Sequence, residues 1–191
     1  MSRQTSGAPQ SARRAPGSGA VVICSRRLAL REFALGDDEF VLRLLNDASF
    51  LRFIGDKGVR TLADARQYIT KSPLDSYRRH GFGLYLVSLS SDGTPIGMCG
   101  LVKRDGLQDA DVGFAFLPQF RSRGYAAESA AAVLDYGRGP LGLPRIVAIA
   151  APDNRASIAV LERIGLEYEC MVRLPGDTRE LQLFGPPPSA T

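Results

Sequence analysis

The fold is decided by the stretch Val112-Gly-Phe-Ala-Phe-Leu-Pro118, Gln119-Phe-Arg-Ser-Arg123, Gly124-Tyr-Ala-Ala-Glu-Ser-Ala-Ala-Ala-Val-Leu-Asp135. Its first part is apolar and ends in a proline, which lacks an N–H and therefore favours the end of a strand. After Gly124, small or apolar residues recur at helical spacing, which predicts an amphipathic helix. The stretch therefore predicts a strand, a basic turn containing glycine, and a helix.

The basic turn is a candidate anion site. The first N–H groups of a helix have no partner within the helix, and its N-terminus carries partial positive charge. Arg121 and Arg123 lie beside those donors, so the turn suits a phosphate or pyrophosphate group. It has neither the Gly-Lys-Ser/Thr ending of a Walker loop nor the three spaced glycines of a dinucleotide fingerprint. A solvated surface turn before an alanine-rich helix remains the alternative.

Arg121-x-x-Gly124-x-Ala126 resembles the Gln/Arg-x-x-Gly-x-Gly/Ala signature of the GNAT N-acetyltransferases. In that family the loop cradles the pyrophosphate of acetyl-CoA, and small residues leave room for phosphate oxygens near the backbone. Tyr125 either lies over the cofactor or packs into the core. The resemblance implies a cofactor loop made of Arg121, Ser122, Arg123, Gly124, Tyr125 and Ala126.

Composition limits the classes of protein. The chain has 191 residues, enough for one domain with a sizeable core. The formal net charge is +4, of which Arg3, Arg13 and Arg14 in the first twenty residues supply three, leaving +1 for the rest. We therefore expect no nucleic-acid partner. No apolar run approaches a membrane span, so we expect no membrane insertion.

The three cysteines lie far apart and His80 is the single histidine. This pattern fits no metal site and no disulfide framework, and it is typical of the reducing cytoplasm. Residues 1–20 are rich in Ser, Ala, Gly, Pro and Arg, which predicts a disordered tail. The domain is expected over 21–185, followed by a C-terminal tail at 186–191. Thr61 and Asp64 predict a capping box at the start of a helix.

Three further segments strengthen the resemblance. Pro95-Ile-Gly97, Asp111-Val-Gly-Phe114 and Asn154-Arg-Ala-Ser157-Ile-Ala-Val-Leu161-Glu-Arg-Ile-Gly165 are similar to family segments in the same order, most like the RimJ/RimL branch. The implied fold is one α/β (α+β) domain with helices around a mixed, mostly antiparallel sheet. In that fold the strands near 111–117 and 145–151 splay apart, and the pantetheine of acetyl-CoA bonds the backbone around Phe116 and Leu117.

The resemblance also implies catalytic residues. An attacking amine must lose a proton, and Asp111 lies where relatives often carry a Glu base, so an intervening water is expected. Many relatives protonate the thiolate with a Tyr, but that position is Leu161, so Ser157 is the candidate. Asn154 either caps a helix or reaches the pantetheine or acetyl group. The alternatives are a solvated acid at 111 and a silent first-turn serine at 157.

The predicted function is an enzyme, an acetyl-CoA-dependent N-acetyltransferase acting on a primary amine of a protein N-terminus or small molecule, without a metal. The acceptor groove is expected between residues 46–60 and 173–178. A homodimer is the default expectation for oligomeric state. The alternative is an acyl-CoA-binding sensor or scaffold that has lost transfer, which the replacements at Leu161 and Asp111 leave open.

Overall fold

The computed structural model describes residues 19–188. Its eight-stranded sheet has the order β1-β2-β3-β4-β5-β6-β8-β7. Neighbouring strands are antiparallel except β5 and β6, which are parallel. The strands are β1 Val21–Cys24, β2 Leu28–Arg31, β3 Leu84–Leu89, β4 Pro95–Val102, β5 Ala110–Phe116, β6 Ile146–Ala150, β7 Glu167–Val172 and β8 Leu181–Gly185.

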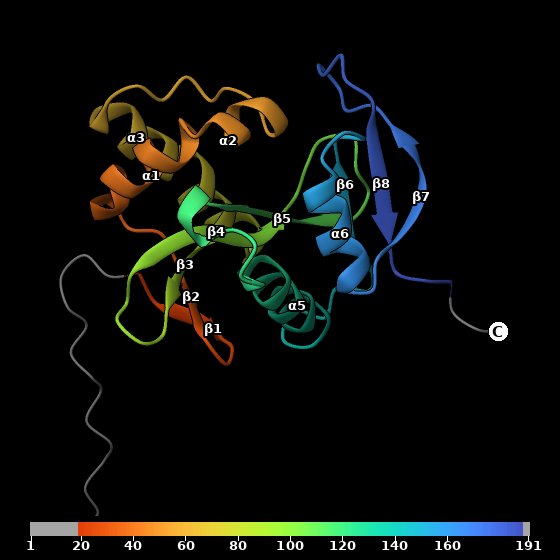
Figure 1. Cartoon of the computed structure of the whole chain (residues 1–191), viewed down its shortest axis with the longest axis horizontal. Coiled ribbons are helices and arrows are strands. Elements are labelled where there is room, and N and C mark those ends of the chain that lie inside the picture. The colour runs from red at the N-terminus through yellow and green to blue at the C-terminus, as the bar shows by residue number, and fades with distance from the viewer. Residues whose placement is uncertain (1–18, 189–191) are drawn as a thin grey trace, which may run out of the picture.

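Helices cover both faces of the sheet (Figure 1). The 14-residue helix α5 packs on one face through Ala130, Val133 and Leu134. Helices α1 and α3 cover the other face, where Leu86 and Met98 of the sheet meet their apolar side chains. The helical segments are η1 Leu35–Asp37, α1 Asp38–Leu45, α2 Ala48–Phe53, α3 Leu62–Ile69, η2 Thr70–Leu74, α4 Asp75–His80, η3 Pro118–Phe120, α5 Tyr125–Arg138 and α6 Arg155–Arg163.

The predicted sheet and its splay are confirmed. Strands β5 and β6 pair only at Ala110 with Ile146 and at Asp111 with Val147. Beyond Asp111 the two strands diverge, and β6 pairs through its other edge with β8. The sheet is therefore split at the carboxyl ends of its one parallel pair.

The local prediction at Thr61 and Asp64 agrees with the structure. Thr61 and Asp64 form the expected capping box, and Pro73 lies in a π-helical turn between α3 and α4. Strand β1 was not predicted, because its four residues have no polar–apolar alternation to mark them. The expected disordered tail at 1–20 lies outside the described residues except for its last two positions, as does part of the tail at 186–191. In residues 19–188, no helix is long and apolar enough to cross a membrane.

Candidate active site

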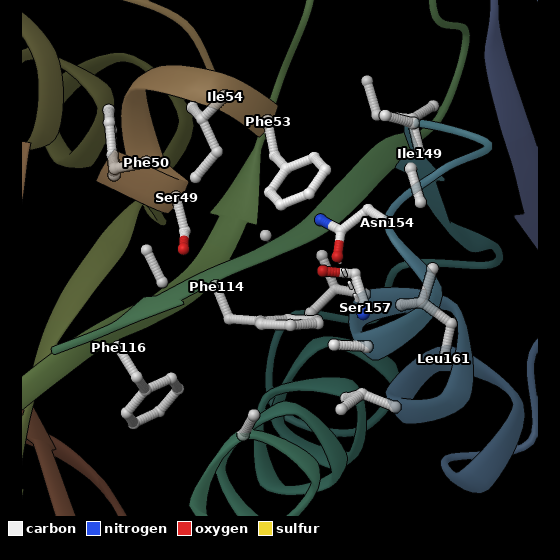
Figure 2. Close-up of a pocket in the computed structure, with 18 of the residues that line it drawn as sticks. Ser49, Phe50, Phe53, Ile54, Phe114, Phe116, Ile149, Asn154, Ser157 and Leu161 are labelled. Carbon is white, nitrogen blue, oxygen red and sulfur yellow. Dashed lines mark hydrogen bonds between the residues drawn. The ribbon is translucent and has the colours of Figure 1, made fainter. Parts of the chain in front are cut away.

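The split between β5 and β6 opens into a cavity of about 720 Å³. Its walls come from both halves of the sheet, from α2, from the loop before α5 and from the start of α6 (Figure 2). Of the residues singled out from the sequence, the cavity is lined by Asp111, Phe116, Arg121, Ser122, Gly124, Tyr125, Ala126, Asn154, Ser157 and Leu161. The structure thus brings together segments more than forty residues apart in the chain.

Along the edge of β5 that faces the split, some backbone N–H and C=O groups form no hydrogen bond within residues 19–188. The Leu117 N–H donates to the Ile96 oxygen of β4 at 3.0 Å. Because alternate residues of a strand point their N–H and C=O to opposite neighbours, Phe114 and Phe116 direct these groups away from β4 and toward the split. The Leu117 carbonyl accepts from the Phe120 N–H at 3.0 Å. Both backbone groups of Leu117 are therefore bonded. Within residues 19–188, the N–H and C=O of Phe114, which the sequence reasoning left out, bond no partner.

The loop between β5 and α5 is shaped by two left-handed residues. Ser122 has φ of 58° and Gly124, the residue before α5, has φ of 79°. Within residues 19–188, the backbone N–H groups of residues 122–127 bond no acceptor, and no side chain caps α5. These donors gather at the N-terminus of a 14-residue helix, where partial positive charge favours an anion. The loop thus fits a pyrophosphate group.

Arg121 does not extend into solvent from this loop. Its Nε donates to the Phe116 carbonyl at 2.9 Å and its Nη1 donates to the Ser49 hydroxyl at 2.9 Å. Its Nη2 forms an ion pair with Asp47, the residue that caps α2. The guanidinium thus joins the end of β5 to the start of α2. Arg123, two residues on, is exposed, does not line the cavity, and forms no ion pair within residues 19–188.

Arg27 was missed by the sequence reasoning, although it lies against the loop. Its guanidinium stacks 4.5 Å above the Tyr125 ring and pairs with Glu128 at 2.6 Å. A Cβ placed on Gly124 would lie 3.4 Å from its Nη2 atom. The Glu128 carboxylate also accepts from the Ser25 hydroxyl and the Arg27 N–H. Glu128 therefore attaches the N-terminus of α5 to the β1–β2 hairpin.

Asn154 and Ser157 lie side by side at the start of α6 and face Phe53 and Phe114 across the cavity (Figure 2). The Asn154 Oδ1 accepts from the Ser157 N–H at 3.2 Å, so Asn154 caps the helix. Within the part of the chain that the structure describes, the Asn154 amide nitrogen donates to no protein acceptor. Leu161 is 1% exposed and belongs to the core.

Asp111 lies at the closed end of the split, where β5 and β6 still pair. Its side chain is 1% exposed, and Arg104 Nε donates to its Oδ1 at 2.8 Å. Burial raises the pKa of the Asp111 carboxyl above its ordinary value, and the Arg104 charge offsets only part of that effect. A carboxylate with a raised pKa is a stronger base than an ordinary aspartate, which suits proton transfer near neutral pH. A solvated strand-end acid, the alternative considered from the sequence, does not describe this residue.

The two segments expected to wall an acceptor groove both contribute to the cavity lining. Residues of 46–60 and 173–178 line the cavity opposite the phosphate loop, among them Phe53, Ile54, Lys57, Leu174 and Asp177. Arg104 and Arg179 line it too and were not anticipated. In residues 19–188, no three His, Cys, Asp or Glu side chains are grouped so as to hold a metal ion.

Comparison with known proteins gives consistent matches. Residues 27–167 match the family model described as "Acetyltransferase (GNAT) domain". An uncharacterized N-acetyltransferase of Bacillus subtilis, YnaD, is 31% identical over 147 residues, covering 77% of this chain and 83% of that protein. The crystal structure of an acetyltransferase (GNAT family) from Bacillus anthracis is 27% identical with a TM-score of 0.71, covering 85% of this chain and 96% of that one.

A structure of RimL, a ribosomal L7/L12 alpha-N-protein acetyltransferase in complex with coenzyme A, has a TM-score of 0.74. It is 19% identical and covers 87% of this chain and 97% of that one. At 19% identity, this match shows a similar fold and nothing about function.

Proposed function

Because the chain belongs to the GNAT acetyltransferase family, whose model spans residues 27–167, we propose that it transfers acetyl from acetyl-CoA to a primary amine. The observation that carries this proposal is that two sets of backbone groups without hydrogen-bond partners within residues 19–188 lie at the same cavity. The N–H groups of residues 122–127 suit the pyrophosphate. The open edge of β5, where Phe114 offers its N–H and C=O and Phe116 offers its N–H, suits the amides of pantetheine.

The contacts proposed for the cofactor differ in part from the sequence-based ones. The backbone of Ser122, Arg123, Gly124, Tyr125 and Ala126 supplies the phosphate donors. Arg121 acts by holding the loop against α2 instead of binding phosphate with its side chain. Phe114 replaces Leu117 as the partner of pantetheine, since both backbone groups of Leu117 are bonded within the protein.

The proposed reaction is a direct transfer. The nitrogen of the acceptor amine attacks the thioester carbonyl carbon, the carbon–sulfur bond breaks, and CoA leaves as the thiolate while the amine loses one proton. Asp111, through a water, receives the amine proton. Ser157 donates a hydrogen bond to the leaving thiolate, and the free Asn154 amide donates to the acetyl oxygen.

A second candidate function is an acyl-CoA-binding domain without transfer. The observation that favours it is the enclosure of Asp111, whose side chain is 1% exposed and already paired with Arg104. Both functions require the cofactor site, and they differ in turnover.

The test begins with calorimetric titration of the whole chain with acetyl-CoA and with CoA, followed by thiol release over a panel of amines. Micromolar binding with amine-dependent thiol release supports the transferase. Binding without release on any amine supports the sensor or scaffold. If neither acetyl-CoA nor CoA binds, the cofactor site assigned to residues 122–127 is wrong.

A further inference from the structure

The end of the cavity opposite the phosphate loop is built from three segments that meet in space. The hairpin between β7 and β8 reaches α2, where Arg179 Nη1 lies 3.5 Å from the Phe53 carbonyl. A Cβ on Gly55 would lie 4.0 Å from Arg179 Nη2. The turn between β4 and β5 packs on the same hairpin, since a Cβ on Gly106 would lie 2.4 Å from Pro175 Cδ. An acceptor that enters here is enclosed by all three segments.

Three cationic side chains line this end of the cavity: Lys57, Arg104 and Arg179. Two of them have acidic partners. Arg179 forms an ion pair with Asp177 at 2.8 Å, and this pairing lowers the pKa of Asp177 to about 2, so that Asp177 is an anion at neutral pH. Arg104 pairs with Asp111. Each of these two arginines thus has an acidic partner in an ion pair, whereas within residues 19–188 Lys57 forms none.

Lys57 forms no salt bridge with any acid in residues 19–188. Although it is exposed as a residue, its side chain lines the cavity. Partial burial lowers the pKa of its ammonium group, repulsion from Arg104 and Arg179 lowers it further, and attraction to the Asp177 carboxylate offsets only part of these effects. An anion placed beside Lys57 relieves this repulsion and adds a charge-assisted hydrogen bond.

Arg104 supplies donors next to the same space. Only its Nε is used in the bond to Asp111, and within the described chain its two Nη atoms donate to no acceptor. A Cβ on Gly113 would lie 4.0 Å from Arg104 Nη2, so the guanidinium lies along β5 beside Gly113. A guanidinium with free Nη groups suits a carboxylate because its planar fork matches two oxygens.

We infer that the acceptor is a primary amine that also carries a carboxylate, which binds between Lys57 and the free Nη groups of Arg104. The apolar side chains of Phe53, Ile54 and Leu174 on the same wall accommodate an aliphatic portion. This inference rests on the proposed function, and it excludes polyamines and aminoglycosides as preferred acceptors because their charge repels Lys57. A free amino acid and the N-terminus of an acidic peptide both supply this chemistry.

The test compares acceptors that differ in one carboxylate. The first series is leucine, leucinamide and isopentylamine, which share the amine and the aliphatic group. The second is the C-terminally amidated peptides Ser-Asp-Ala and Ser-Asn-Ala. Thiol release measures transfer, and calorimetry on the CoA-loaded protein measures binding. At least one carboxylate-bearing acceptor is expected to exceed its neutral counterpart about 10- to 100-fold in kcat/KM, the range of one charge-assisted hydrogen bond.

Lys57→Met and Lys57→Glu test the assignment to this residue. Lys71→Met is the matched control, because Lys71 is an exposed lysine that does not line the cavity. Lys57→Met is expected to remove most of the preference for the carboxylate and to leave CoA affinity unchanged. Lys57→Glu is expected to reverse the preference, and Lys71→Met to retain it.

The outcomes separate the inference from the proposed function. If leucine is preferred over leucinamide, the acceptor is a free amino acid. If Ser-Asp-Ala is preferred over Ser-Asn-Ala, the acceptor is an acidic peptide. Carboxylate-dependent binding that requires Lys57 but leads to no thiol release supports the anion site and refutes the transferase. Equal or better use of the neutral acceptors, or a preference unchanged in Lys57→Met, overturns the inference while the transferase stands.

Discussion

Arg121→Ala and Arg123→Ala should differ in their effect on stability, although both arginines belong to the same basic turn. Arg121 bonds the Phe116 carbonyl, the Ser49 hydroxyl and the Asp47 carboxylate. Arg123 is exposed and forms no ion pair within the described residues. Arg121→Ala is therefore expected to lower the stability of the fold, and Arg123→Ala to leave it unchanged.

The size of the expected loss in free energy of unfolding follows from the hydrogen-bond partners that each substitution leaves without a donor. Hydrogen bonds to charged groups contribute about 1.5–3 kcal/mol each when both partners are buried. The Arg121 side chain is 36% exposed, and Asp47, 11% exposed, keeps its bonds to the N–H groups of Ser49 and Phe50. We therefore expect Arg121→Ala to lower the free energy of unfolding by about 2–3 kcal/mol. For a chain of this size, that loss lowers Tm by roughly 4–12 °C. For Arg123→Ala the change should stay within about 0.5 kcal/mol.

Thermal and urea unfolding of both variants measure these changes, and calorimetric titration with CoA at a temperature where both are folded measures affinity. Arg123→Ala should weaken CoA binding by no more than about fivefold, about 1 kcal/mol, through loss of one exposed charge near the phosphates. Acetyl-pantetheine, which lacks phosphates, is the control ligand and should bind this variant and the wild type equally. A wild-type Tm for Arg121→Ala together with much weaker CoA binding would show that Arg121 binds phosphate directly.

Four further predictions follow from the site. Gly124→Asp and Gly124→Asn share a side-chain shape and tolerate a positive φ, so both should show the same Tm, while the aspartate binds CoA at least 10-fold more weakly by calorimetry. Asp111→Asn should lower kcat about 10²-fold. In the wild type, the acidic limb of the plot of kcat/KM against pH should lie above the ordinary aspartate pKa of 3.8, because burial raises the pKa of Asp111. The pH profile of the variant should lack this limb. Burial raises the pKa of Glu128, but hydrogen bonds from Ser25 and Arg27 outweigh this effect, so the net pKa shift is downward. The stabilisation of the fold by ionised Glu128 is therefore present above pH 4.5 and is lost as pH falls through the folded-state pKa. Glu128→Gln should thus cost about 1 kcal/mol at pH 7 in urea unfolding and progressively less below pH 4.5. In hydrogen exchange, CoA should protect the Phe114 amide, whereas the Leu117 amide, bonded to Ile96, should be protected with or without CoA.

The parts of the fold that the sequence predicts well are those set by neighbouring residues. The capping box at Thr61 and Asp64 and the strand–turn–helix around Gly124 are both local in sequence. Periodicity and turn chemistry determine such features within a few residues. The resemblance of several such segments, in the same order, to those of the GNAT family then indicated the fold.

The side-chain contacts at the site were less predictable because they join distant segments. Arg121 was expected to face phosphate, yet its partner Asp47 lies 74 residues away. Glu128 lies in the first turn of α5, yet its carboxylate is bonded to Arg27, 101 residues away. A sequence shows that a turn is basic, but the partners of its arginines depend on which elements the fold brings beside it.

The split in the sheet raises the question of what holds its halves together. Two residue pairs join β5 to β6, too few to fix their relative position. The core beneath them is continuous, since Val133 and Leu134 of α5 belong to the same buried cluster as Val112 of β5 and Ala148 of β6. At the opposite end, Arg52 of α2 pairs with Asp153, which precedes α6, at 2.8 Å. That pair is exposed and contributes little stability, so packing on α5 must position the two edges. The backbone groups of β5 can then remain unpaired without the strands closing, and this is the condition for an extended ligand to bond them as a strand would.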